Sequence, residues 1–114
     1  ELGIRDDGRL KVFLDDERTA PDESWVTVRT PQQAIALLAT EMVKELSLDH
    51  DLGDDEGIGT GYDVVLWLEE ETHNNINFDP PEVMKVHSAN VSARTKMEQG
   101  LAVVRRLDFE HGDN

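Results

Sequence analysis

The chain has 114 residues, with 25 Asp and Glu against 11 Lys and Arg, a formal net charge of −14, and no cysteine. The acidic balance argues against an extended nucleic-acid surface, which needs cations to neutralise phosphates. The lack of cysteine excludes disulfides and thiolate metal sites and agrees with a cytoplasmic location. No apolar stretch approaches the roughly 18 residues of a membrane span, so we expect no membrane partner. The length of the chain fits a single domain over 1–114, with its core at about 10–106 and a tail at 107–114.

Two strands are predicted in the first part of the chain. Leu10 to Leu14 is an apolar run typical of a buried strand, and residues 25–29 alternate as a strand at a sheet edge does. The segment 16–24 between them has few apolar residues and contains Pro21. We therefore expect no full crossover helix there.

A helix is predicted to begin after Thr30. Its hydroxyl suits an N-cap, Pro31 suits the first turn, and Gln33 completes a capping box. The apolar residues that follow at spacings of three and four predict one face packed on a sheet. They are Ala34, Ile35, Leu38 and Met42.

The second half of the chain continues to alternate strands with helices. We predict strands at 46–48, with a start near Glu45, and at 83–86. Helices are predicted over 62–72 and 91–106, and the tail from Asp108 is expected to fray. Alternating strands and helices with right-handed crossovers imply an α/β fold with a parallel sheet of order 2-1-3-4.

Polar residues follow three of the predicted strands. Asp15 and Asp16 follow the first strand, Asp49 and His50 the third, and His87 the fourth. Ligands of open parallel sheets bind beyond the carboxyl ends of the strands. We therefore expect these side chains to converge on one polar site.

The three aspartates are the candidate metal ligands. Asp15, Asp16 and Asp49 would repel one another if brought together, and the pKa of at least one would rise unless a cation lay between them. Carboxylate oxygens suit a hard divalent ion, Mg²⁺ or Mn²⁺. The alternative is that one or two of them are solvated turn or cap residues.

The two histidines are candidates for proton transfer, because imidazoles exchange protons near neutral pH. If His50 and His87 faced each other, they could act as general acid and base, and we count them with Asp49 as the catalytic residues. They could instead bind a transition metal with Asp49 or Asp51. Each could also be an incidental hydrogen-bonding residue.

A phosphate site is expected at the start of the last helix. Ser88 and Asn90 lie in the turn before it, and the free N–H groups of a helix start attract anions. Arg94 lies one turn further along, and Arg18 is a more distant candidate for a phosphate contact. The same residues could be plain caps and surface charges. Gly57, Gly59 and Gly61 are expected to form a loop over the site.

Five segments, taken in order, resemble the cyclic-phosphate-processing receiver domains, a family derived from response-regulator receivers. They are LDDER (14–18), WVTVRT (25–30), SLDHDLG (47–53), GTGYDVVLWLEE (59–70) and VHSAN (86–90). The resemblance implies a small three-layer, receiver-type (flavodoxin-like) fold, here without the fifth strand and its lysine. It also implies that Asp49 stands where receivers carry a phosphoacceptor.

The resemblance implies a phosphoesterase that acts on a cyclic phosphate, such as the 2′,3′-cyclic phosphate end of RNA or of a nucleotide. Its ligand would be a phosphorylated small molecule or an RNA terminus. Two alternatives stay open. One is a receiver-like switch in which Asp49 accepts phosphate and the domain binds a protein partner or a second copy. The other is an inactive binding module that keeps the site as structure.

Overall fold

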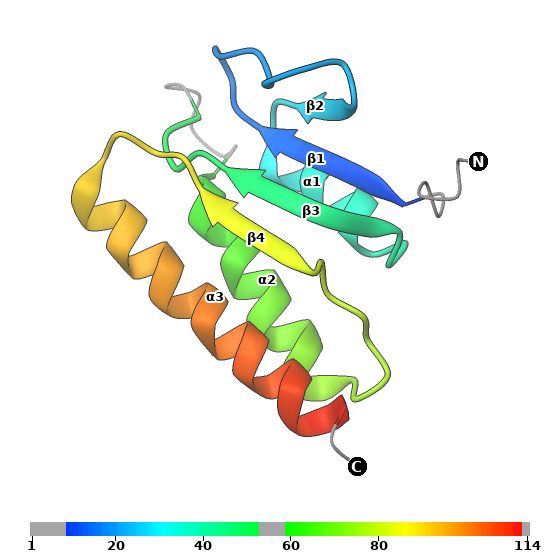
Figure 1. Ribbon diagram of the computed structural model, residues 1–114. Helices are drawn as coiled ribbons and strands as arrows, with labels where there is room; N and C mark the ends of the chain where they lie inside the picture. Colours follow the sequence, from blue (N-terminus) through cyan, green and yellow to red (C-terminus); the bar gives the residue numbers. More distant parts are fainter. Residues whose placement is uncertain (1–8, 53–58, 113–114) are drawn as a thin grey trace.

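The computed structural model describes residues 9–52 and 59–112. Its strands are β1 (Leu10–Leu14), β2 (Trp25–Val28), β3 (Val43–Leu48) and β4 (Val83–Val86), and its helices are α1 (Pro31–Leu38), α2 (Gly61–Asn74) and α3 (Val91–Gly112). The strands form one parallel sheet of order β2-β1-β3-β4 (Figure 1). The predicted order and the receiver-type α/β fold, without a fifth strand among the described residues, are confirmed.

The first helix follows its local signals closely. The Thr30 hydroxyl accepts a hydrogen bond from the backbone N–H of Gln33, and the Gln33 side chain accepts one from the backbone N–H of Thr30. The prediction that Met42 shares the inner face of this helix is wrong. The helix ends at Leu38, Glu41 turns the chain with a φ of 62°, and Met42 is 43 % exposed just before β3.

The ends of two other elements differ from the predictions. β3 starts at Val43 rather than near Glu45, since Val43 is itself buried at the base of the sheet. The last helix does not stop at Arg106 but continues to Gly112, through residues expected to fray. Its inner residues Met97, Leu101 and Val104 are fully buried, or nearly so.

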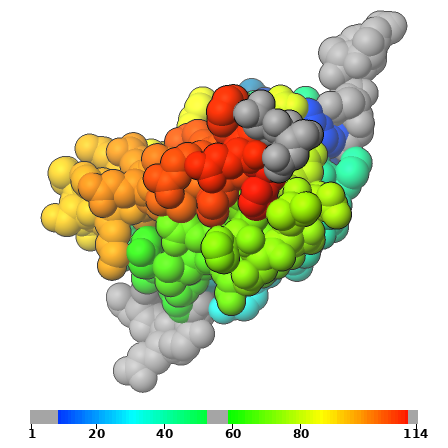
Figure 2. Space-filling model, turned by 90° about the horizontal axis from the view of Figure 1, so that it is seen from below, coloured from blue at the N-terminus to red at the C-terminus, as the bar shows by residue number. Residues whose placement is uncertain are grey.

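The core lies on one face of the sheet. Alternate strand residues, among them Val12, Leu14, Leu46 and Leu48, join buried residues of all three helices in one cluster. The helices lie next to one another in the order α1, α2, α3, and the strands are drawn in front of α1 and α2 in Figure 1. Figure 2 shows α3 and α2 side by side.

The described residues therefore form two layers, one of strands and one of helices, where three layers were expected. The segment between β1 and β2 contains no helix, in agreement with its few apolar residues and Pro21. On the face that no described helix covers, Phe13 packs edge-on against Trp25 at a centroid distance of 6.0 Å. Within the described part of the chain, no helix is long and apolar enough to cross a membrane.

Candidate metal centre

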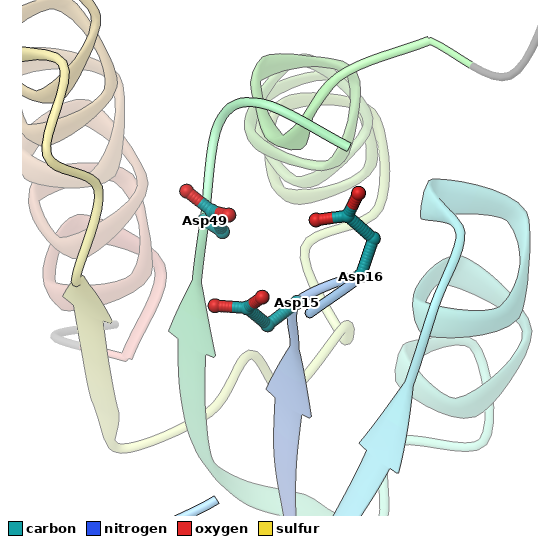
Figure 3. A group of neighbouring side chains, drawn as sticks. All are labelled: Asp15, Asp16 and Asp49. Carbon is teal, nitrogen blue, oxygen red and sulfur yellow. The ribbon is translucent and has the colours of Figure 1, made fainter. Parts of the chain in front are cut away.

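Three carboxylates meet beyond the ends of β1 and β3. One oxygen from each of Asp15, Asp16 and Asp49 lies within 4.8 Å of the others, and Figure 3 shows the three side chains grouped above the strand ends. They line a pocket of about 450 Å³. Their convergence was predicted from the positions of Asp15 and Asp49 directly after neighbouring strands of one parallel sheet.

The pocket has four further lining residues besides the three aspartates. They are Glu17, Arg18, Asp51 and Ala89. Three of these four side chains are charged, and among the described lining residues only Arg18 is a cation. The lining is therefore strongly acidic, which suits a cation better than a bare anion.

Asp15 is held in its ionised form although it is only 1 % exposed. Burial alone would raise its pKa, but hydrogen bonds from the backbone N–H groups of Arg18 and Glu17 and from His87 outweigh burial and lower the pKa. Both backbone bonds end on Oδ1 at 2.8 Å. The turn after β1 thus stabilises a buried negative charge.

Asp49 has the opposite electrostatic balance. Burial raises its pKa, and the negative charge of Asp15 raises it further, although a hydrogen bond from the backbone N–H of His50 acts against both. Asp49 and Asp15 therefore disfavour simultaneous ionisation in the absence of a cation. A divalent ion between them would remove this conflict, and the oxygen-only donor set fits Mg²⁺ or Mn²⁺.

His87 is bound at both ring nitrogens. Its Nε2 lies 3.0 Å from Oδ2 of Asp15, and its Nδ1 lies 2.7 Å from the hydroxyl oxygen of Ser47. The ring stacks on Phe13, with centroids 4.4 Å apart and planes 5° apart. His87 therefore touches the acidic cluster through Asp15, and it is not one of the residues that line the pocket.

His50 makes a separate contact. Its Nδ1 lies 2.8 Å from Oδ1 of Asp51, which lines the pocket. In the described part of the chain no hydrogen bond joins His50 to His87, and their action as general acid and base stays a prediction. Each ring is paired instead with a different carboxylate, which separates the roles the two histidines can take.

Two arginines connect the strand ends: Arg18 links the ends of β1 and β4, and Arg29 links the ends of β2 and β1. Arg18 donates to the backbone carbonyl of His87 at 2.8 Å, and its Nε lies 4.0 Å from Oδ2 of Asp15. Arg29 donates to the backbone carbonyl of Asp15 at 2.8 Å. Arg18 also lines the pocket, so it is placed to meet an anion there, whereas Arg29 supports the backbone of the turn.

The predicted phosphate residues lie at the start of α3. The Asn90 side chain accepts from the backbone N–H of Ala93, so Asn90 caps the helix, while the Ser88 hydroxyl accepts from the N–H of Asn90. Arg94 donates to the carbonyl of Ser88 at 3.3 Å. Ala89, between the two polar residues, is the member of this turn that lines the pocket. A role of Ser88, Asn90 and Arg94 in substrate binding stays a prediction.

The glycine-rich loop lies partly outside the described residues, which exclude Gly57. At Gly61 the backbone approaches the chain after β3 very closely: its N–H donates to the carbonyl of His50 at 3.1 Å, and a Cβ there would overlap the carbonyl of Asp49. Gly61 is therefore needed for packing next to the acidic cluster. The expectation of a cover over the site is not tested by Gly59 and Gly61 alone.

Ser47 is the contact that the sequence reasoning missed. The strand predicted at 46–48 includes Ser47 within the apolar run Leu46-Ser47-Leu48. Because strand residues alternate, Ser47 faces away from the buried Leu46 and Leu48, toward the same side as its register partner Phe13. That alternation was the available signal for a polar role on the other face of the sheet.

Comparison with known proteins agrees with this geometry. The family model of the cyclic-phosphate processing receiver domain matches residues 10–103. The match spans all four strands, α1, α2 and most of α3, and so includes every residue of the acidic cluster. Searches of curated proteins and of solved structures gave no match.

Proposed function

Because the chain belongs to the cyclic-phosphate processing receiver domain family, we propose that it is a metal-assisted phosphoesterase. Its substrate class would be cyclic phosphates, such as the 2′,3′-cyclic phosphate of an RNA end or of a nucleotide. Hydrolysis adds water to phosphorus and breaks one ring P–O bond, leaving a phosphomonoester and a free hydroxyl. The protein would then belong to the processing of RNA ends or of their nucleotide products.

The observation that carries the proposal is the close approach of three carboxylates, which each place one oxygen within 4.8 Å of the other two. Asp15 keeps its charge through backbone hydrogen bonds, while the pKa of Asp49 is raised by burial and by Asp15. These opposite shifts fit a cation site with Asp15, Asp16 and Asp49 as ligands and Mg²⁺ or Mn²⁺ as the ion. The ion would polarise a phosphoryl oxygen and offset the negative charge around an anionic substrate.

The chain's own residues would bind the phosphate and move the protons. Arg18 lines the pocket and can donate to phosphate oxygens, and the start of α3, with Ser88, Asn90 and Arg94, lies beside Ala89 at the pocket wall. His50, paired with the pocket residue Asp51, is the candidate for protonating the leaving oxygen. His87 would contribute to proton transfer at the same site through its contact with Asp15.

The proposal is tested by following hydrolysis of a 2′,3′-cyclic nucleotide with Mg²⁺, with Mn²⁺ and with excess chelator. Metal-dependent turnover that is lost in Asp16→Asn, at unchanged thermal stability, would support it. Glu110→Gln, an exposed acidic residue near the end of α3, serves as the matched control and should keep full turnover. The absence of turnover with every divalent ion would contradict the proposal.

The same protein samples separate the two alternatives. Incubation with acetyl phosphate and Mg²⁺ would add one phosphoryl group to a receiver-like phosphoacceptor, and intact mass would detect it at Asp49. A phosphoesterase would show no stable gain in mass. An inactive module would show neither turnover nor a mass gain.

A further inference from the structure

Ser47 is the first of three residues joined by two hydrogen-bond contacts, and each of the three lies in or directly after a different strand. Its hydroxyl oxygen is 2.7 Å from Nδ1 of His87, and Nε2 of His87 is 3.0 Å from Oδ2 of Asp15. Ser47 and Asp15 are 7 % and 1 % exposed, so water has little access to either end. The contacts connect β3, the residue after β4 and the residue after β1 on the face that no described helix covers.

The direction of these hydrogen bonds follows from the donors available. The Asp15 carboxylate, held ionised by its backbone contacts, can only accept, so Nε2 of His87 must carry the hydrogen. In the neutral ring Nδ1 is then an acceptor, and the Ser47 hydroxyl donates to it. Asp15 therefore selects the tautomer of His87, and the hydrogen bond from Ser47 holds the ring in the orientation that donates to Asp15.

Stacking on Phe13 cannot do this alone. The parallel rings, 4.4 Å apart, fix the plane of the imidazole but leave it free to rotate within that plane or to flip. A flip would exchange the nitrogens for ring carbons and remove the hydrogen bond to Asp15. The hydroxyl of Ser47 supplies the second constraint, and it comes from the strand that lies between β1 and β4.

We propose that Ser47 is a positioning residue for the cation site, acting through His87 to hold the Asp15 carboxylate in its binding orientation. This inference rests on the proposed function for the identity of the site. Hydrogen-bond partners behind a metal ligand commonly change metal affinity by about 10–100-fold when they are removed. Ser47 touches neither the pocket nor, by this account, the substrate.

Two readouts test the proposal. In protein with ¹⁵N-labelled histidine and no metal, long-range ¹H–¹⁵N NMR should show His87 as the Nε2–H tautomer, with His87→Gln identifying its signals. Ser47→Ala removes the hydrogen bond to Nδ1, so it should shift the Nδ1 resonance of His87 away from its wild-type position and raise the Kd for Mn²⁺ about 10-fold. Ser47→Thr, which keeps the hydroxyl, should restore both.

Thr27→Ala is the matched control. Thr27 is a hydroxyl residue on the same sheet face, is the register partner of Phe13 in β2, and is exposed. It should leave the Nδ1 resonance of His87 and the Kd for Mn²⁺ unchanged. If Ser47→Ala behaves like Thr27→Ala in both readouts, the proposal is overturned. Failure of the wild-type protein to bind Mn²⁺ would contradict the cation site itself, whereas the metal-free NMR readout decides whether Ser47 fixes His87.

Discussion

Oδ2 of Asp15 lies 3.0 Å from Nε2 of His87, although the strands that precede these residues, β1 and β4, are not neighbours in the sheet. β3 lies between them, so the His87 ring reaches Asp15 across β3, where it contacts Ser47 and stacks on Phe13. Arg18 strengthens the same connection by donating to the His87 carbonyl. The ends of three strands are thereby fixed relative to one another before any ligand binds.

Asp49→Asn should stabilise the metal-free protein at neutral pH. The pKa of Asp49 is raised in the folded state by burial and by Asp15, so its contribution to stability is present below the ordinary Asp pKa and is lost as the pH rises through the raised value. Asparagine removes this loss. We expect a gain of about 1 kcal/mol in the free energy of unfolding, the scale of two charges about 4 Å apart in a water-like dielectric.

Urea unfolding at several pH values with chelator present measures this effect. The gain should shrink as the pH falls toward about 3.9, the ordinary pKa of Asp. Asp15 contributes with the opposite sign, because its lowered pKa gives stability that is present above the ordinary value and lost as the pH falls through the lowered one. A destabilised Asp49→Asn protein at pH 7 would show that the two carboxylates do not repel each other.

Divalent cations should stabilise the folded protein through the same carboxylates. An ion that binds only the folded state adds about 2.7 kcal/mol at a concentration of 100 times its Kd. We expect thermal unfolding to shift upward with Mg²⁺ or Mn²⁺ in the wild-type protein and to stay in place in Asp16→Asn. An equal shift in both proteins would place the bound ion away from the acidic cluster.

Gly61→Ala should destabilise the protein by about 1–3 kcal/mol, the range for overpacking a filled site. A Cβ at Gly61 would lie 1.9 Å from the carbonyl oxygen of Asp49, so the chain after β3 must move. Val91→Ala, at the exposed first residue of α3, is the control and should change stability by less than about 0.5 kcal/mol. If Gly61→Ala and the wild-type protein were equally stable in urea unfolding, the chain after β3 would accommodate the added Cβ without a loss of stability.

His50→Gln should lower the turnover of a 2′,3′-cyclic nucleotide by about 100-fold, the lower end of the range for losing a general acid or base. The substitution leaves the three aspartates in place, so the affinity for Mn²⁺ should stay within the error of the measurement. His73→Gln, in the last turn of α2 and exposed, is the matched control. If His50→Gln keeps full turnover, His50 has no part in proton transfer.

The parts of this protein that follow local rules could be predicted from the sequence. The apolar runs that precede Asp15 and Asp49 predicted β1 and β3. The order of these strands in a parallel sheet predicted that the carboxylates of Asp15 and Asp49 would lie close together. The start of α1 was equally readable, because Thr30 and Gln33 form a capping box within one turn.

The remainder depends on contacts between distant residues. His87 follows a strand as His50 does, yet its partners are Ser47 and Asp15, which are 40 and 72 positions away in the sequence, and sequence spacing cannot reveal them. The single helix layer was missed for a related reason. The few apolar residues of 16–24 predict that no helix lies between β1 and β2, but they do not show that the sheet face around Phe13 then has no described helix over it.

The most direct test is the structure of a crystal soaked with Mn²⁺ and phosphate, with anomalous diffraction to locate the metal. We predict one manganese peak within coordination distance of Asp15, Asp16 and Asp49, with a phosphate oxygen bound to it and Arg18 contacting the phosphate. A crystal that binds manganese elsewhere, or that shows no manganese at these carboxylates at saturating concentration, would contradict it.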